Sequence, residues 1–298
     1  RMRLVTLAEI PEQWAERVRS WHRVLGEEAR ALDDSALEYF FYQTLLGSFP
    51  ASGGTPSPDY RERLGGAMIK AAREARRRTS WARPNEEYEA RLTALIDAAL
   101  GSPRFMDEFR PFQQRVAHAG ARNSLVQTVL KLTLPGVPDI YQGSELWDLT
   151  LVDPDNRRAV DYDLRSRMLG EMLSAWERDP AASIRDLAGQ WQDGRIKMLL
   201  IAVLLRLRST TDAFETGDYL PCEVTGGEGG AFLRRGANAQ VLVTFRRFPF
   251  AGANPQPSSR LRLPESRQWH DVLRRRDGAP DHEWAVDAEL PVGVYLSN

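Results

Sequence analysis

The first part of the chain repeats apolar residues at helical spacing. Trp14, Val18, Trp21 and Leu25 lie three or four positions apart, and residues at that spacing share one face of a helix. Pro11 precedes them, and the first turn of a helix tolerates proline because the amide at that position has no partner within the helix. The pattern predicts an amphipathic helix that starts near Pro11 and packs its tryptophans into a core.

Similar periodicity predicts several further helices. Residues 33–35 offer N-caps, because their side-chain oxygens can accept hydrogen bonds from the free amides of a first helical turn. Glu86 and Glu87 suit the positive end of a helix dipole, and Asp163 is the expected cap of a later helix. The predicted helices carry Leu37, Phe41 and Leu45, or span residues 59–78, 85–100, 105–119, 121–134, 164–176 and 196–207.

After Gly217 the pattern changes to short apolar runs separated by glycine, proline and asparagine. Such runs are typical of strands joined by turns. The predicted strands span residues 219–224, 231–234, 240–246, 260–263, 269–273, 284–286 and 292–296. Several short strands at this spacing favour a small β-sandwich.

Composition limits the classes of partner. A chain of 298 residues is long enough for two domains, and 40 basic against 41 acidic residues leave a net charge of -1. That balance gives no long-range field that would favour nucleic acid or an anionic membrane. The single cysteine, Cys222, cannot form an internal disulfide, and no apolar run approaches the ~20 residues of a membrane span. A reducing cytoplasm is the expected compartment.

Residues 135–161 differ from the rest of the chain. A short apolar segment over residues 137–141 reads as a strand that ends at Gly143, and a polar loop containing Trp147 follows it. In α/β barrels, polar loops at the carboxyl end of a buried strand carry the chemistry, because the scaffold below them is rigid. The residues alone leave a second interpretation, a salt-bridged turn, since Asp-Pro and Asp-Asn are frequent turn formers.

Three sequence strings carry a resemblance to a known family. They are TSWARPNEEYE at residues 79–89, NSLVQTVLKLTLPG at 123–136 and VPDIYQGSELWDLTLVDPDNRRAVDYDLR at 137–165. The last resembles the eighth strand and following loop of the α-amylase superfamily, and the three together resemble its maltooligosyl trehalose synthase branch. The similarity runs from residue 3 to residue 295 and is strongest between residues 37 and 165.

The resemblance implies a fold of mixed α and β class. A mainly helical region would carry the last strand and helix of a (β/α)8 barrel, and a small antiparallel β-sandwich domain would follow it. The implied regions are a helical insertion at residues 1–134, the last barrel strand, loop and helix at 135–190, and a helix with the sandwich at 191–298. We expect the chain to be the C-terminal part of a larger enzyme.

The implied activity of that parent enzyme is conversion of the reducing-end α-1,4 bond of a maltooligosaccharide to an α,α-1,1 bond. Enzymes of the superfamily use a carboxylate nucleophile, a carboxylic acid/base and a third aspartate, and in the family all three precede the segment seen here. No catalytic residue is therefore expected in this chain, and the isolated chain is expected to be inactive. The resemblance implies no cofactor, and the scattered histidines show no metal-ligand spacing.

The resemblance also suggests residues that line the sugar pocket. The candidates are Trp81, Asn85, Glu86, Tyr141, Glu145, Trp147, Asp153, Asp155, Asn156, Arg157 and Arg158. Aromatic rings match the apolar C–H side of glucose, although large aromatics more often belong to a core, and burial is the rival explanation for Tyr141. Arg157 or Arg158 could instead orient a catalytic carboxylate by a charge-assisted pair, and the sequence does not separate these roles.

Two alternatives remain open at this stage. One is a non-catalytic carbohydrate-binding or scaffolding module. The other is nucleic-acid binding through the basic residues of 70–78, for which a solvated helix face is the favoured explanation given the balanced total charge. The expected partners are a maltooligosaccharide and the missing N-terminal part of the same barrel, with no nucleic acid and no membrane.

Overall fold

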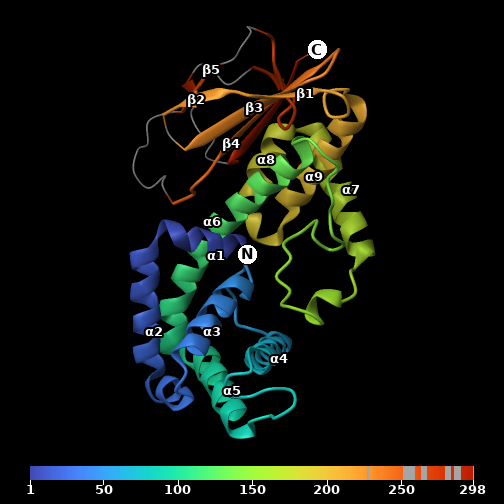
Figure 1. Ribbon diagram of the computed structural model, residues 1–298. Coiled ribbons are helices and arrows are strands. Elements are labelled where there is room, and N and C mark those ends of the chain that lie inside the picture. The colour runs from blue at the N-terminus through green and yellow to red at the C-terminus, as the bar shows by residue number, and fades with distance from the viewer. Residues whose placement is uncertain (227, 251–258, 263–266, 279–282, 285–289, 298) are drawn as a thin grey trace. The chain divides into compact units, whose positions relative to one another are not determined.

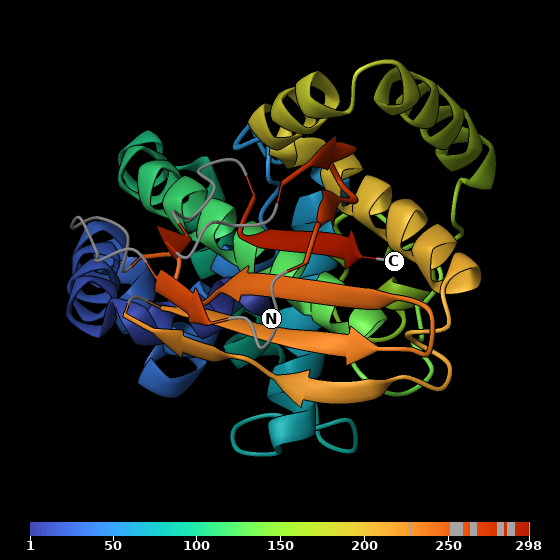
Figure 2. The ribbon, with the colours of Figure 1, turned by 90° about the horizontal axis from the view of Figure 1, so that it is seen from above.

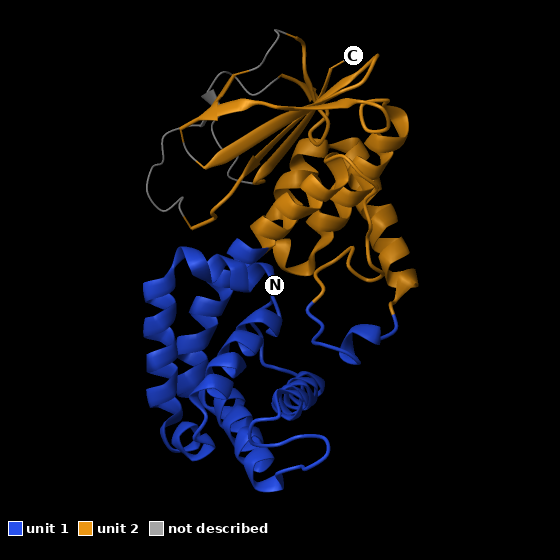
Figure 3. Ribbon diagram, viewed as in Figure 1, with its two compact units in different colours: residues 1–120, 149–159 blue, residues 121–148, 160–298 orange. Residues whose placement is uncertain are grey.

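A computed structural model describes residues 1–226, 228–250, 259–262, 267–278, 283–284 and 290–297. Figure 3 shows that the chain forms two compact units. Unit 1 comprises residues 1–120 and 149–159, and unit 2 comprises residues 121–148 and 160–298. The three regions predicted from the sequence are not tested by this division and stay a prediction.

Unit 1 is helical in all its regular elements (Figure 1). Its elements are α1 (Met2–Thr6), η1 (Leu7–Glu9), α2 (Pro11–Leu32), α3 (Ser35–Ser48), α4 (Pro58–Ala75), α5 (Glu86–Gly101), the start of α6 (Pro103–Thr133) and η2 (Asp155–Arg157). Asp34 caps α3 and Ser57 caps α4, each accepting from an amide of the first turn. The helices predicted from periodicity in this region are confirmed, with small shifts at their ends.

Aromatic side chains form the core of unit 1. Trp21 is fully buried, and its ring centroid lies 5.4–5.9 Å from those of five aromatic neighbours. These neighbours come from α2, α3 and α6, and they are Trp14, Tyr42, Phe105, Phe109 and Phe112. Trp21 therefore joins the helices of the unit, as the sequence pattern predicted.

The helical structure predicted at residues 105–119 and 121–134 is confirmed up to Thr133, but the predicted break between the two helices is wrong, because one helix, α6, runs through both. Glycine in a helix interior costs only about 0.5–1 kcal/mol relative to alanine, which packing can offset. At Gly120 a Cβ atom would lie 2.8 Å from the backbone nitrogen of Arg3. This glycine thus allows α1 to approach α6 and does not end the helix.

Unit 2 combines helices with two antiparallel sheets. Its further helices are α7 (Tyr162–Arg178), α8 (Pro180–Gly189), η3 (Trp191–Asp193) and α9 (Arg195–Thr210). The larger sheet has the order β1-β3-β4-β9-β6-β7 and the smaller one β2-β5-β8. The strands are β1 (Asp218–Pro221), β2 (Glu223–Thr225), β3 (Gly229–Arg235), β4 (Gln240–Arg246), β5 (Ser259–Arg262), β6 (His270–Asp271), β7 (Arg276–Asp277), β8 (Glu283–Trp284) and β9 (Val292–Ser297).

The larger sheet separates two apolar layers. Phe232, Val241 and Val294 pack with the apolar residues of α7, α8, α9 and the end of α6. On the other face, Leu233 and Leu242 pack with Leu261 of β5. Figure 2 shows the long strands side by side from above. The mixed fold of helices and antiparallel strands is confirmed, whereas the sandwich and the barrel part stay predictions.

The strand predictions needed some correction. The run at residues 219–224 is split between β1 and β2, which lie in different sheets, and β7 was not predicted. Residues 285 and 286 of the predicted 284–286 strand and Leu263 of the 260–263 strand lie outside the described residues. Asp161, not Asp163, caps α7 by accepting from the amide of Leu164 at 2.8 Å.

The strand predicted at residues 137–141 is wrong for this structure, because these residues have no regular secondary structure. Neither described sheet includes them. A strand exists only where neighbouring backbones accept and donate its hydrogen bonds. The Val137 side chain is 97% exposed, whereas Ile140 of the same segment packs against the helical core of unit 2.

Within the described part of the chain, no helix combines the length and apolar character needed to cross a membrane.

Candidate functional site

The loop at residues 149–159, which contains the predicted residues 153–158, is fixed to α4 by partly buried contacts of charged side chains. The Asp155 carboxylate accepts from Arg63 Nη1 at 2.9 Å and from the Leu151 amide at 2.8 Å. Its side chain is only 12% exposed. Lys70 Nζ donates to the Asp153 carbonyl oxygen at 2.5 Å. These bonds join residues far apart in sequence and set the course of the loop along the helix.

The outer charges of the same loop also have partners. Arg158 donates to both carboxylate oxygens of Asp59, at 3.2 and 3.4 Å. Arg158, together with Arg63, holds the pKa of Asp59 below its usual range through hydrogen bonds. Arg157 pairs with Asp153 within the loop. The salt-bridged turn considered from the sequence is therefore present, and Asn156 is left exposed at its centre.

The segment at residues 79–89 is organised around Glu89. Its carboxylate is buried and accepts from Arg73 at 2.8 and 2.6 Å and from Thr79 Oγ1 at 2.6 Å. The Arg73 hydrogen bonds hold the Glu89 pKa below its usual range, with Thr79 adding to the effect. Asn85 caps α5, because its Oδ1 accepts from the Tyr88 amide at 3.1 Å.

The residues of this segment that were predicted to contact sugar differ in exposure and in local hydrogen bonding. Trp81 is 59% exposed, and the Arg73 guanidinium carbon lies 4.9 Å from its ring centroid, a cation–π arrangement that holds one side of the indole. Glu86 is exposed in the first turn of α5. Asn85 uses both side-chain groups locally, since its Nδ2 donates to the Arg78 carbonyl oxygen at 3.3 Å.

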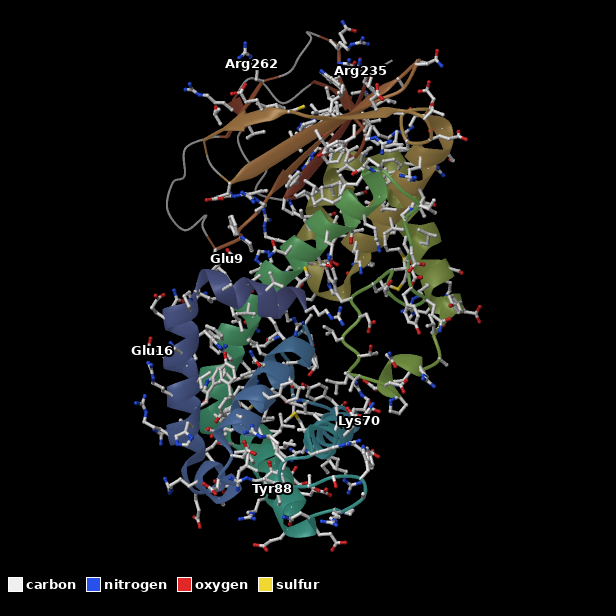
Figure 4. The ribbon with its side chains drawn as sticks, viewed as in Figure 1. Glu9, Glu16, Lys70, Tyr88, Arg235 and Arg262 are labelled. Carbon is white, nitrogen blue, oxygen red and sulfur yellow. The ribbon has the colours of Figure 1, made fainter. Side chains whose placement is uncertain are left out.

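One face of α4 supports both segments. Asp59, Arg63, Lys70 and Arg73 are spaced so that they lie along one side of the helix. The first three contact the 149–159 loop, and Arg73 contacts Glu89 and Trp81. Figure 4 labels Lys70 of α4 and Tyr88 of α5 among the side chains of unit 1. The predicted residues Trp81, Asn85, Glu86 and 153–158 are thereby assembled in unit 1.

The pairing on α4 also bears on nucleic acid. Of the basic residues at 70–78, Arg73 is bound to Glu89, Arg78 lies 3.2 Å from Asp33, and Lys70 holds the Asp153 carbonyl. Phosphate binding depends on cations that are free to replace counterions. These contacts favour a structural role for Lys70, Arg73 and Arg78.

The remaining candidates lie in unit 2. Tyr141 is 53% exposed. Glu145 pairs with Arg165 of α7 at 3.3 Å. Trp147 is partly buried against the helical core, and its Nε1 donates to the Trp191 carbonyl oxygen at 2.6 Å. Whether these residues contact sugar stays a prediction.

A pocket that the sequence did not predict lies between α3, α4 and α5. Its volume is about 260 Å³, and apolar side chains, four of them alanines, form most of its wall. The lining residues are Asp34, Ala36, Leu37, Phe40, Ala71, Ala72, Ala75, Arg77, Arg78 and Tyr88. None of them is a predicted sugar contact.

Comparison with known proteins identifies relatives over the whole chain, although no protein family model matches it. A Mycobacterium tuberculosis H37Rv protein named as a maltooligosyl trehalose synthase is 33% identical over 311 residues, which cover 99% of this chain and 35% of that protein. The chain thus spans about a third of the length of the curated relatives it matches.

Solved structures give the same result. The maltooligosyltrehalose synthase of Arthrobacter ramosus matches 100% of this chain with 36% of its own, at 29% identity and a TM-score of 0.78. A structure described as DSM5389 glycosyltrehalose synthase matches at 33% identity and a TM-score of 0.78, with 100% of this chain and 36% of that one covered. These matches confirm the resemblance expected from the sequence strings.

Proposed function

The chain is homologous to the C-terminal part of maltooligosyl trehalose synthases, and from this relationship we propose that it is the C-terminal portion of a trehalose-forming enzyme. The parent enzyme converts the reducing-end α-1,4 bond of a maltooligosaccharide to an α,α-1,1 bond. The homology over 99% of the chain is the observation that carries this proposal.

The reaction is an intramolecular transglycosylation. A carboxylate breaks the reducing-end α-1,4 bond and forms a glycosyl-enzyme, and a carboxylic acid protonates the departing glucose. That glucose stays bound and turns, and its anomeric hydroxyl attacks the covalent intermediate while the second carboxylate takes its proton. Two displacements give net retention. The reacting carboxylates are assigned to the part of the parent enzyme upstream of this chain.

The role proposed for the chain is to wall the sugar cavity. The cycle yields transfer only if water is kept away from the covalent intermediate while the freed glucose is held. The 149–159 loop suits a wall because the partly buried Arg63–Asp155 ion pair fixes it to α4. Trp81 offers an exposed flat face whose orientation Arg73 sustains, and the apolar side of a glucose ring matches such a face.

The proposed partner is the upstream part of the same barrel. Residues 137–141 fall in neither described sheet, and Val137 and Tyr141 are exposed. An unpaired segment with exposed apolar side chains can add to the edge of a sheet, where backbone hydrogen bonds supply affinity. In the parent enzyme these residues would form the last barrel strand.

A second candidate function is a carbohydrate-binding module without catalysis. It is favoured by the ion pairs of Asp153, Asp155 and Glu145, whose carboxylates anchor loops to arginines. Incubation of the isolated chain with maltopentaose tests what both candidates share, the absence of catalytic carboxylates from this chain. We expect no loss of reducing ends, and formation of a non-reducing product by the chain alone would contradict the assignment of the carboxylates to the upstream part.

Replacing Trp81 tests the proposed wall. In the enzyme that includes the upstream part, Trp81→Ala should raise hydrolysis relative to transfer, because the freed glucose loses a stacking surface and water enters more easily. Stacking of this kind is worth about 1 kcal/mol, so a several-fold change in the product ratio is expected. Glucose and non-reducing product are quantified from the same reaction. Trp81→Phe keeps a flat face and should change the ratio less, and an unchanged ratio in Trp81→Ala would remove Trp81 from the wall.

A further inference from the structure

The loop at residues 141–148 is contacted by residues 191–197, which comprise η3 and the start of α9. Lys197 Nζ donates to the carbonyl oxygen of Ser144 at 2.5 Å and to that of Leu146 at 3.2 Å. Trp147 Nε1 donates to the Trp191 carbonyl oxygen. Gly194 lies against the loop so closely that a Cβ atom there would be 2.8 Å from the Trp147 backbone nitrogen. The 191–197 segment therefore contacts the loop at three points.

A second cation holds the other side of the loop. Arg165 of α7 donates to the Gly143 carbonyl oxygen at 3.2 Å and to the Glu145 carboxylate at 3.3 Å. The carbonyls of residues 143, 144 and 146 thus all accept from a charged side chain. With its carbonyls turned toward cations, the loop has a defined backbone course without belonging to a helix or strand.

Lys197 is not an ordinary surface lysine. Burial lowers its pKa to about 8, and Lys131 adds to that effect, whereas Asp148 and Glu145 act in the opposite direction. Its ammonium also lies 5.8 Å from the centroid of the Trp147 ring. Burial of this charge has a desolvation cost. The hydrogen bonds of Lys197 to two loop carbonyls offset that cost, because they are charge-assisted and therefore strong.

We propose that Lys197 is a positioning residue that fixes the 144–146 turn and so sets where Glu145 and Trp147 meet the maltooligosaccharide. The sugar part of this inference rests on the proposed function, and the loop part does not. Removing the ammonium leaves two partly buried carbonyls without their donor, and an acceptor that loses its partner favours conformations in which water can reach it. The loop then opens more often, and the side chains it carries lose their common orientation.

Hydrogen exchange of the loop amides tests the loop part. Lys197→Met keeps the length of the side chain and removes its charge and donors. Lys131→Met is the matched control, because it removes a nearby exposed positive charge and no bond to the loop. In the full chain, amides of residues 143–148 should exchange roughly tenfold faster in Lys197→Met and at the wild-type rate in Lys131→Met. Equal exchange in all three proteins would overturn the inference.

A titration of the wild-type chain keeps the inference testable if Lys197→Met does not fold. The carbonyl carbon signals of Ser144 and Leu146 should titrate together with a midpoint near the Lys197 pKa of about 8. Deprotonation lowers the charge of the donor, so both signals should move in the direction expected for weaker hydrogen bonds. Signals that stay constant between about pH 7 and about pH 10 would overturn the inference, because the expected midpoint lies within this range.

Binding of maltopentaose to the same three proteins tests the sugar part. Lys197→Met should weaken binding roughly tenfold and Lys131→Met should not change it. Faster loop exchange with unchanged affinity would remove the loop from the sugar site and leave its support by Lys197 intact. A wild-type chain that does not bind maltopentaose would count against the proposed function, and the exchange experiment would still decide whether Lys197 holds the loop.

Discussion

Trp21→Ala is expected to lower the free energy of unfolding by about 3–5 kcal/mol, the cost typical of removing a large aromatic side chain from a core. Trp21 has no exposed surface and contacts aromatic rings from α2, α3 and α6. These helices support α4 and, through it, the segments at residues 79–89 and 149–159. Loss of the indole would leave a cavity that its rigid aromatic neighbours cannot fill.

Denaturant unfolding followed by circular dichroism measures this change. Trp81→Ala is the matched control, because it removes the same side chain from an exposed position, where substitutions usually stay within about 0.5 kcal/mol of wild type. A loss of less than about 1 kcal/mol in Trp21→Ala would contradict the aromatic core described for unit 1.

Asp155→Ala is expected to release the 149–159 loop from α4. The substitution leaves the Arg63 guanidinium and the Leu151 amide without their shared acceptor, and such a loss costs about 1–3 kcal/mol where the groups are withdrawn from solvent. The cost falls on the closed form of the loop, so local opening should rise by about 5-fold to more than 100-fold. Limited proteolysis measures this as faster cleavage within residues 149–159.

Asp153→Ala provides the control in the same loop. Its carboxylate pairs only with the exposed Arg157, whereas the contact with Lys70 is made by its backbone carbonyl and survives the substitution. Surface pairs of this kind contribute about 0–1 kcal/mol, so cleavage should stay close to wild type. Equal acceleration in both variants would show that Asp155 has no special part in fixing the loop.

The sequence predicted those elements whose stability is local or repetitive. Helices α2 and α3 follow from apolar spacing with Pro11 and Asp34 at their starts, and β4 was predicted with its observed ends. The strand at residues 137–141 failed, because a strand depends on neighbours that its own residues do not specify. The break at Gly120 failed because the glycine makes room for α1, which lies far away in sequence.

The candidate site was predicted only in part, because its contacts also depend on residues far apart in sequence. The 79–89 segment and the loop at residues 153–158 were chosen from their sequence strings, but the helix that joins them, α4, was not. Arg63 and Asp155 are 92 positions apart, and no periodicity links them. The basic residues of α4 were interpreted as a solvated face, and Glu89 stands among other acids in the first turn of α5, so the sequence did not single it out as a buried partner.

The most direct test supplies the part of a relative that this chain does not match. The purified chain is mixed, or expressed together, with the N-terminal two thirds of the Mycobacterium tuberculosis relative, of which this chain matches 35%, and each part is also assayed alone. Reducing ends of maltopentaose and non-reducing product are measured together. The account predicts conversion only when both parts are present, with loss of reducing ends matched by formation of a maltooligosyl trehalose. A stable complex of the two parts that binds maltopentaose without converting it would contradict the account.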